Sequence, residues 1–323
     1  MPYYPSSKRQ AQYFLSRIIY INIAGSQGYF IFTIQYQGNR LPFMMKHTII
    51  LYSLLLASFF SHAQFDSLRP DNKVYKVDLK YELPGSLLFM TASYFGFREL
   101  DRVATFDESD VLKLNPQNIN GFDRSAAFYN PAGFDKAQAH SDLFLNISIA
   151  SPVLLALDGK IRKDWLDLVT MYLVTHAADN IVYFATAFPI RRARPLTYNP
   201  EVPMAVKVGE ARSNSFFSGH VSFSATSTFF LVKVLTDYHH IKGWQRIALY
   251  TAAAVPPGLV GYYRMRAGKH FKTDVMLGML VGASSGILIP ELHRKLKKNK
   301  SLALQPYFSP IDGASGLSLS LKF

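Results

Sequence analysis

The 323-residue chain is 49% hydrophobic and 14% aromatic, which excludes a disordered protein and allows a large core. Its formal net charge is +13, but no stripe of basic residues alternates with stacking aromatics. We therefore expect no nucleic-acid partner and favour anionic lipid headgroups or phosphate esters. The absence of cysteine excludes disulfides, thiolate catalysis and cysteine–zinc sites.

Residues 45–63 have the features of a secretory signal peptide: a short basic start, an apolar middle and a small-residue end. We expect cleavage before Gln64, and a first membrane helix is the alternative interpretation. Because a signal peptide stands at the start of a protein, we expect Met44 or Met45 to be the true start. Residues 1–44 would then lie upstream of the translated protein.

Residues 64–138 form a mixed N-terminal envelope segment. One short apolar helix is predicted at 84–97, and it is too short to span a bilayer comfortably. Asn-Pro pairs and glycines in the polar, aromatic stretch 101–142 predict loops and short helices. We interpret the neighbouring Asp123 and Arg124 as a local ion pair without a catalytic role.

A catalytic helical bundle is predicted over residues 139–296. Its five helical segments are 142–157, 164–188, 219–238, 244–263 and 273–293. Pro256 and Pro257 must kink or break the fourth of them. The remaining residues, 297–323, are a basic linker and a tail whose alternating apolar and polar residues predict a β-hairpin.

Basic residues lie in the connections between these helices at 160–163 and 242–246, and in the run 293–300 after the last one. If all three face the cytoplasm, the connections that carry the motifs described below face the periplasm. The uncharged runs stop just short of a clean span of about 18 to 20 residues. We expect an inner-membrane bundle in a bacterial cell envelope, with a soluble periplasmic bundle as the alternative.

Three short motifs concentrate the residues suited to phosphoryl chemistry. They are Arg194-Pro195, then Ser218-Gly219-His220, then Arg264, His270 and Asp274 within eleven residues. Asp274 follows His270 by four residues, a step that fits one helical face, so its carboxylate could hold the imidazole. Arginine is a ready partner for anionic oxygens. Two histidines, a carboxylate and several arginines together suggest phosphoryl transfer.

In order and spacing these motifs resemble those of the superfamily of type 2 phosphatidic acid phosphatases, bacterial class A acid phosphatases and vanadium haloperoxidases. The superfamily pattern is Lys, six residues, Arg-Pro; then Pro-Ser-Gly-His; then Ser-Arg, five residues, His, three residues, Asp. The chain departs from it at Ala187, Phe217 and Tyr263, in place of Lys, Pro and Ser. The resemblance implies an all-α fold, a six-helix bundle of the phosphatidic acid phosphatase type 2 kind, in which 84–97 supplies the sixth helix.

The resemblance also implies roles for the histidines and their neighbours. His270 would be the nucleophile, with Asp274 on its other ring nitrogen to stabilise a phosphohistidine. His220 would be the general acid that protonates the leaving oxygen and later activates water. Ser218 and the amide of Gly219, at the start of a helix, would form an anion site.

Arginines would hold the transferring phosphoryl group. Arg194 and Arg264 would clamp its equatorial oxygens, where charge must be stabilised in the transition state. Ala187 removes one cation of the superfamily pattern, and Arg192 and Lys269 are candidates to replace it. No metal and no cofactor is expected.

The predicted function is therefore a cell-envelope phosphatase that hydrolyses phosphomonoesters or lipid phosphates through a phosphohistidine, without a metal. The partners expected are a phosphorylated lipid or small phosphoester, and the membrane. One alternative, motivated by Ala187, is a degenerate family member that binds phosphate or lipid without turnover. A vanadium haloperoxidase is the other, and it depends on many cations around vanadate.

Overall fold

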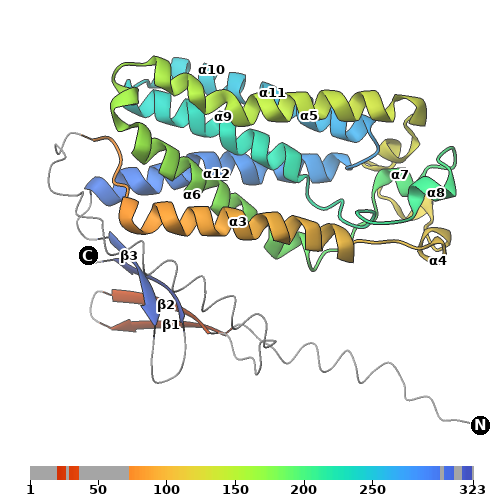
Figure 1. The fold of residues 1–323 in the computed structure, drawn as a ribbon, viewed down its shortest axis with the longest axis horizontal. Coiled ribbons are helices and arrows are strands. Elements are labelled where there is room, and N and C mark those ends of the chain that lie inside the picture. Colours follow the sequence, from red (N-terminus) through yellow and green to blue (C-terminus); the bar gives the residue numbers. More distant parts are fainter. Residues whose placement is uncertain (1–19, 27–28, 36–72, 299–301, 309–314, 322–323) are drawn as a thin grey trace, which may run out of the picture. The chain divides into compact units, whose positions relative to one another are not determined.

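The computed structural model describes residues 20–26, 29–35, 73–298, 302–308 and 315–321 (Figure 1). The chain divides into two compact units, one of Pro70–Arg294 and one of Met1–Arg69 with Lys295–Phe323. The signal peptide predicted at 45–63 lies outside the described residues.

The larger unit is built from helices. The long ones are α3 (Leu79–Val103), α5 (Phe134–Ala150), α6 (Trp165–Ala187), α9 (Gly219–Tyr238), α10 (Gly243–Ala253), α11 (Val255–Arg266) and α12 (Lys272–Lys298). Short helices connect them: α4 (Glu108–Leu112), η3 (Pro116–Asn118), η4 (Arg124–Phe128), η5 (Pro131–Gly133), η6 (Ser151–Leu157), η7 (Ile161–Asp164), α7 (Pro195–Tyr198) and α8 (Met204–Lys207). The all-helical prediction holds for this unit, whereas the expected count of six helices is not confirmed.

Several helices differ from their predicted bounds. The helix expected at 142–157 is α5, which begins at Phe134 and ends at Ala150, followed by the 3₁₀ helix η6. The predicted helix 244–263 is divided at Ala254 into α10 and α11, because Pro256 and Pro257 fit only the first turn of a helix, where no backbone donor is needed. The short helix expected at 84–97 is the 25-residue α3, which Asp78 caps by accepting a hydrogen bond from the Lys80 amide. Charged residues that flank the apolar run are good helix formers and extend it at both ends.

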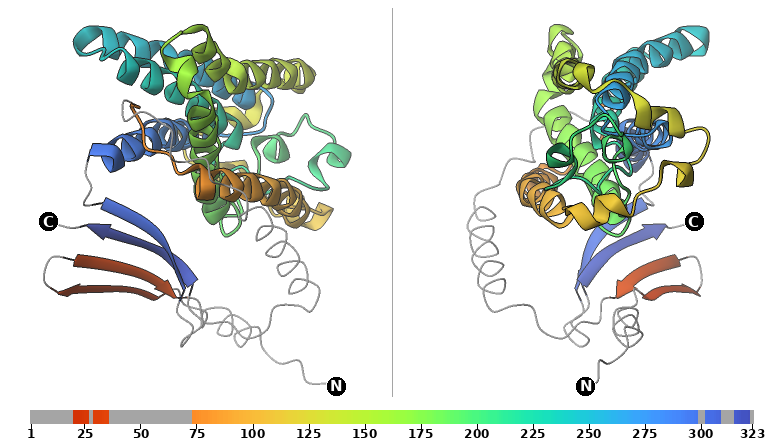
Figure 2. Two further views of the ribbon diagram at one scale, coloured as in Figure 1. Left: turned by 60° about the vertical axis from the view of Figure 1, so that its left-hand side comes forward. Right: turned by 90° about the vertical axis from the view of Figure 1, so that its right-hand side faces the viewer.

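Close packing of α9 against α12 brings the beginnings of these two helices together. A Cβ atom at Gly278 would lie 2.5 Å from the carbonyl oxygen of Ser218, and one at Gly286 would lie 2.6 Å from that of Thr226. Glycine at both positions therefore lets the two backbones touch. Both helices begin at the end of the bundle where α4, α7 and α8 lie (Figure 1). The right-hand view of Figure 2 faces this end.

Apolar side chains are exposed along parts of the bundle. The stretches Pro131–Leu157 and Lys272–Leu296 are long and apolar enough to cross a membrane, by length and composition alone. Large exposed side chains on them include Leu143, Ile147, Val153, Met276, Leu280 and Leu288.

The smaller unit contains two antiparallel strand pairs. β1 (Tyr20–Ser26) pairs with β2 (Tyr29–Gln35), and β3 (Leu302–Phe308) pairs with β4 (Ser315–Leu321). β1 and β2 fall within the residues that we expect to lie upstream of the true start, and that expectation stays a prediction.

Candidate active site

The three motifs meet at one end of the larger unit. Ser218 stands immediately before α9, and its backbone amide donates to the carbonyl oxygen of Asp274 in the first turn of α12, at 3.1 Å. Arg264 lies in the last turn of α11, and His270 lies in the turn between α11 and α12. Chain segments that are distant in the sequence therefore converge because the long helices begin or end here.

His270 is buried, with 2% of its surface exposed. Its Nδ1 donates to the carbonyl oxygen of Ser215 at 2.7 Å, since a carbonyl can only accept. The lone pair of the neutral ring is then on Nε2, which lies 3.5 Å from Nη2 of Arg264. Burial, followed by the charges of Arg264 and Arg194, holds the pKa of His270 well below its usual value. The imidazole is therefore neutral, with its nucleophilic nitrogen facing a guanidinium.

Asp274 contacts His270 through Ser215 instead of directly. Its carboxylate accepts from Ser215 Oγ at 2.6 Å and from the Phe271 amide at 2.9 Å, and it pairs with Arg192. The expected direct bond fails because α12 begins at Lys272, so that His270 precedes the helix and shares no helical face with Asp274. Ser215, which the motifs do not include, is the link between them.

His220 lies in the first turn of α9 and is partly open to solvent. Its Nε2 is 3.4 Å from Oδ1 of Asp142 on α5. Burial, and then the charge of Arg264, lower the pKa of His220 to about 4, although Asp142 opposes the shift. Gln138, one turn before Asp142, donates to that carboxylate at 2.8 Å and accepts from Arg264 Nη1 at 2.9 Å. Sequence reasoning missed both α5 residues, because neither belongs to a motif.

The cations of the site have unused hydrogen-bonding capacity. Arg264 is 3% exposed, and its Nε has no partner among the described residues; the buried Ser218 hydroxyl likewise has none there. Arg194 donates to Asn214 Oδ1 at 3.0 Å. Burial, and then the charges of Arg194 and Arg264, lower the pKa of Lys269 to about 8. A bound anion would accept hydrogen bonds from the unpaired buried donors and would offset the repulsion between the cations.

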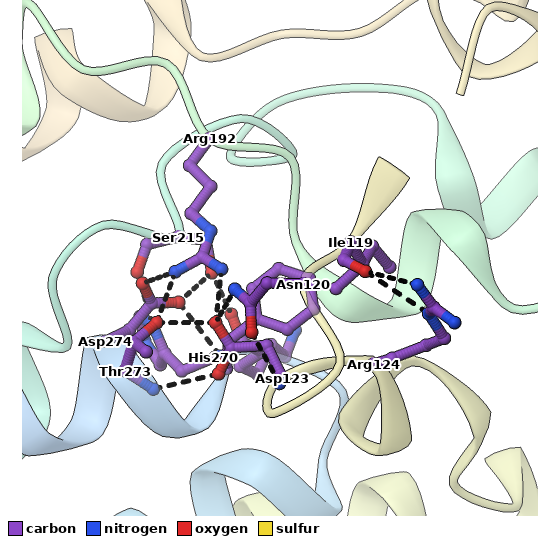
Figure 3. Close-up of polar contacts among 11 residues, drawn as sticks. Ile119, Asn120, Asp123, Arg124, Arg192, Ser215, His270, Thr273 and Asp274 are labelled. Carbon is purple, nitrogen blue, oxygen red and sulfur yellow. Dashed lines mark hydrogen bonds and ion pairs between the residues drawn. The ribbon is translucent and has the colours of Figure 1, made fainter. Parts of the chain in front are cut away.

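Arg192, in contrast, is committed to protein partners (Figure 3). It pairs with Asp274 and, at 2.7 Å, with Asp123, and its guanidinium lies 4.2 Å from the ring centre of Phe271. The expected local pair of Asp123 and Arg124 is wrong, because Arg124 donates to the backbone carbonyl of Ile119 at 2.9 Å. Of the two proposed replacement cations, Arg192 is thus held by two carboxylates, which leaves Lys269 as the candidate.

The position of the missing lysine is filled by core packing. Ala187, at the end of α6, is fully buried in a cluster with Leu100, Tyr183 and Phe217. Tyr183 also lies against Gly219, where a Cβ atom would be 3.1 Å from its Cε2. Glycine at 219 therefore allows this phenol ring to reach the start of α9. Among the residues that the structure describes, no group of three or more His, Asp or Glu is placed to hold a metal ion.

Comparisons with known proteins give one family and two solved structures. Residues 168–298 match the PAP2 superfamily. LpxE of Aquifex aeolicus is 19% identical, with a TM-score of 0.35, and the match covers 50% of this chain and 87% of that one. A transmembrane PAP2 type phosphatidylglycerolphosphate phosphatase from Bacillus subtilis is 20% identical, with a TM-score of 0.36, and the match covers 68% of this chain and 96% of that one. No curated protein matches the chain.

Proposed function

The chain belongs to the PAP2 superfamily through residues 168–298, and we propose that it hydrolyses phosphate esters through a phosphohistidine on His270. One observation carries this proposal: the buried neutral imidazole presents Nε2 at 3.5 Å from Nη2 of Arg264, a guanidinium whose Nε has no protein partner in the described part of the chain. A nucleophile beside unused cationic donors suits an anionic electrophile such as a phosphoryl group.

The first step forms a phosphorus–nitrogen bond. Nε2 of His270 attacks phosphorus, the bond from phosphorus to the leaving oxygen breaks, and protonated His220 gives its proton to that oxygen. The phosphorylated ring is positive, and its Nδ1–H stays bonded to the Ser215 carbonyl. In the second step neutral His220 takes a proton from water, which attacks phosphorus and breaks the phosphorus–nitrogen bond. Phosphate is released and the imidazole is regenerated.

The oxygens of the phosphoryl group would be held by donors from four segments. Arg194, Arg264 and Lys269 supply charge, and the hydroxyl of Ser218 and the amide of Gly219 supply hydrogen bonds at the start of α9. A helix N-terminus favours anions because its first amides have no helical partner and the helix dipole is positive there. Lys269 in this proposal replaces the cation that Ala187 removes.

Lys269→Ala is therefore expected to lower kcat/KM for p-nitrophenyl phosphate by about 10- to 100-fold, the equivalent of one charge-assisted hydrogen bond of about 1.5–3 kcal/mol. Lys272→Ala is the matched control, since that amine lies 5.1 Å from the Phe122 ring centre, and it should stay within about twofold of wild type. Equal kcat/KM in Lys269→Ala and wild type would remove Lys269 from the phosphate site.

The overall proposal is tested by phosphate release from a panel of esters. The purified protein would be incubated with phosphatidate, phosphatidylglycerol phosphate, undecaprenyl pyrophosphate, lipid A and small phosphoesters. Release from any of them supports a phosphatase and names its substrate class. Binding of inorganic phosphate without release from any ester would instead establish the non-catalytic alternative.

We further propose that the bundle lies in the bacterial inner membrane with the site facing the periplasm. The two apolar stretches, Pro131–Leu157 and Lys272–Leu296, support insertion. Helix directions support the orientation: α6 ends at the site and α9 and α12 begin there, so their other ends, near the basic connections, are about 30 Å away. Positively charged connections favour the cytoplasmic side.

A reporter fused after Lys300 is expected to read as cytoplasmic, because α12 begins beside the site and would cross the membrane once. Activity of a cytoplasm-dependent and a periplasm-dependent reporter at the same fusion point measures this directly. A periplasmic signal, with protein released without detergent, would contradict the membrane proposal and establish the soluble bundle.

A further inference from the structure

We propose that Asp123 and Arg192 are positioning residues for the nucleophile, acting on His270 through Asp274 and Ser215. The proposal rests on the function proposed above. Asp123 lies outside the residues that match the PAP2 superfamily, 168–298. The segment before α5 thus becomes part of the catalytic unit of this chain.

Asp123 is fully buried, and its carboxylate accepts hydrogen bonds from three other residues (Figure 3). Its carboxylate accepts from Arg192 Nη2 at 2.7 Å, from the Thr273 hydroxyl at 2.6 Å and from Asn120 at 2.9 Å. Although burial opposes ionisation, these bonds lower the pKa of Asp123 below its usual value. The group is therefore a carboxylate at neutral pH.

The same carboxylate caps α12 from a distant segment. The backbone amide of Thr273, in the first turn of α12, donates to Asp123 Oδ1 at 3.0 Å. Such an amide has no partner within its own helix, and a negative charge at this point is favourable to the helix dipole. Asp123 thereby fixes the turn of helix that carries Asp274.

Arg192 joins Asp123 to the segment that orients the imidazole. Its guanidinium bridges the carboxylates of Asp123 and Asp274, and its backbone carbonyl accepts from the amide of Ser215 at 3.0 Å. Asp274 in turn accepts from the Ser215 hydroxyl, and the Ser215 carbonyl accepts from Nδ1 of His270. Ser215 is held on both sides by groups that Arg192 positions, and its carbonyl selects the Nδ1–H tautomer that frees Nε2 for attack.

The charges of this cluster complement the positive ring formed in catalysis. Two buried carboxylates share one guanidinium on the Nδ1 side of His270, while Arg264 lies on the Nε2 side. When both carboxyls are ionised, the cluster carries one net negative charge. Neutralising Asp123 would leave Arg192 to cancel the charge of Asp274. The phosphorylated imidazolium would then lose both its fixed orientation and part of its electrostatic stabilisation.

The test uses the full chain with Asp123→Asn, Arg192→Gln and the double variant. Asparagine keeps the size of the side chain and an acceptor for the Thr273 amide, and removes the charge. Arg124→Gln is the matched control, because Arg124 is the next residue and donates only to carbonyls of its own segment, those of Ile119 and Gln117. Two readouts are taken: kcat and KM for p-nitrophenyl phosphate, and the ¹⁵N NMR signals of the His270 ring, assigned by their loss in His270→Ala.

Asp123→Asn should lower kcat by about 10- to 100-fold, the usual effect of removing a partner that orients a functional group, with KM within about twofold. The double variant should be no slower than Arg192→Gln, because both residues act along one path. The ring signals should show a mixture of the two tautomers in place of the Nδ1–H form, and Arg124→Gln should match wild type. If Asp123→Asn does not fold, Arg192→Lys, which keeps one of the two ion pairs, should show the same changes at intermediate size.

An unchanged His270 tautomer in a folded Asp123→Asn protein would overturn the proposal, whatever its turnover. So would an equal loss of kcat in Arg124→Gln, which would show a general effect of the segment. If wild type hydrolyses no ester and the tautomer still shifts, the positioning network stands and the proposed phosphatase function fails. The two ideas are thereby separated.

Discussion

Changing His270 to Ala is expected to abolish phosphate-ester hydrolysis, with kcat falling by at least about 10⁴-fold. No other ring nitrogen in the motifs combines burial with a free lone pair beside a guanidinium. Loss of the nucleophile removes the covalent route altogether, whereas loss of a positioning group only slows it. Rapid mixing with ³²P-labelled substrate, an acid or base quench and a count of protein-bound label measures the intermediate.

The expected label is stable to base and labile to acid, as a phosphohistidine is, and it should be absent from His270→Ala. His239→Ala is the control, because His239 pairs with Asp158 at 2.7 Å at the C-terminal end of α9, away from the site. That variant should retain wild-type kcat. Turnover in His270→Ala, or label that survives acid, would mean that another group carries the phosphoryl.

The motif residues could be predicted from the sequence because spacing within short segments limits how far they separate. Arg264, in the last turn of α11, and His270, in the connection that follows, are only six residues apart. Ser218, Gly219 and His220 lie at the start of α9, so each group stays together in any fold that forms those helices. That the three motifs lie together in one site could be predicted only from the resemblance to the superfamily. Packing of Gly278 against the carbonyl of Ser218 is the physical reason for it, and no local pattern indicates this contact.

The supporting residues could not be predicted, because they depend on where a helix begins. The four-residue spacing predicts that Asp274 contacts His270, as it would if both lay on one helix. However, α12 begins between them, and the Asp274 carboxylate contacts Ser215 and Arg192 instead. From the sequence, the adjacent Asp123 and Arg124 predict a local ion pair. The cation that Asp123 contacts is Arg192, 69 residues later in the sequence, and only the fold brings the two together.

Replacing His220 by Ala is expected to lower kcat for an alkyl phosphate by about 10²- to 10⁴-fold, the usual contribution of a general acid–base. Aryl phosphates have better leaving groups and need less help from an acid, so their first step should be nearly unaffected. Hydrolysis of the intermediate still needs a base, so labelled phosphohistidine should accumulate in this variant with p-nitrophenyl phosphate. A burst of p-nitrophenol equal to the enzyme concentration measures that accumulation.

The pH dependence separates this role of His220 from a merely structural one. With its pKa lowered to about 4, chiefly by burial and then by Arg264, His220 in the free enzyme is neutral at pH 7. Only the protonated ring can donate to the leaving oxygen, and its population falls tenfold for each pH unit above that value. We therefore expect kcat/KM of wild type for an alkyl phosphate to fall as the pH rises above about 4. In His220→Ala the remaining dependence should be that of the substrate's own ionisation, and an unchanged pH profile in this variant would assign the proton transfer to another group.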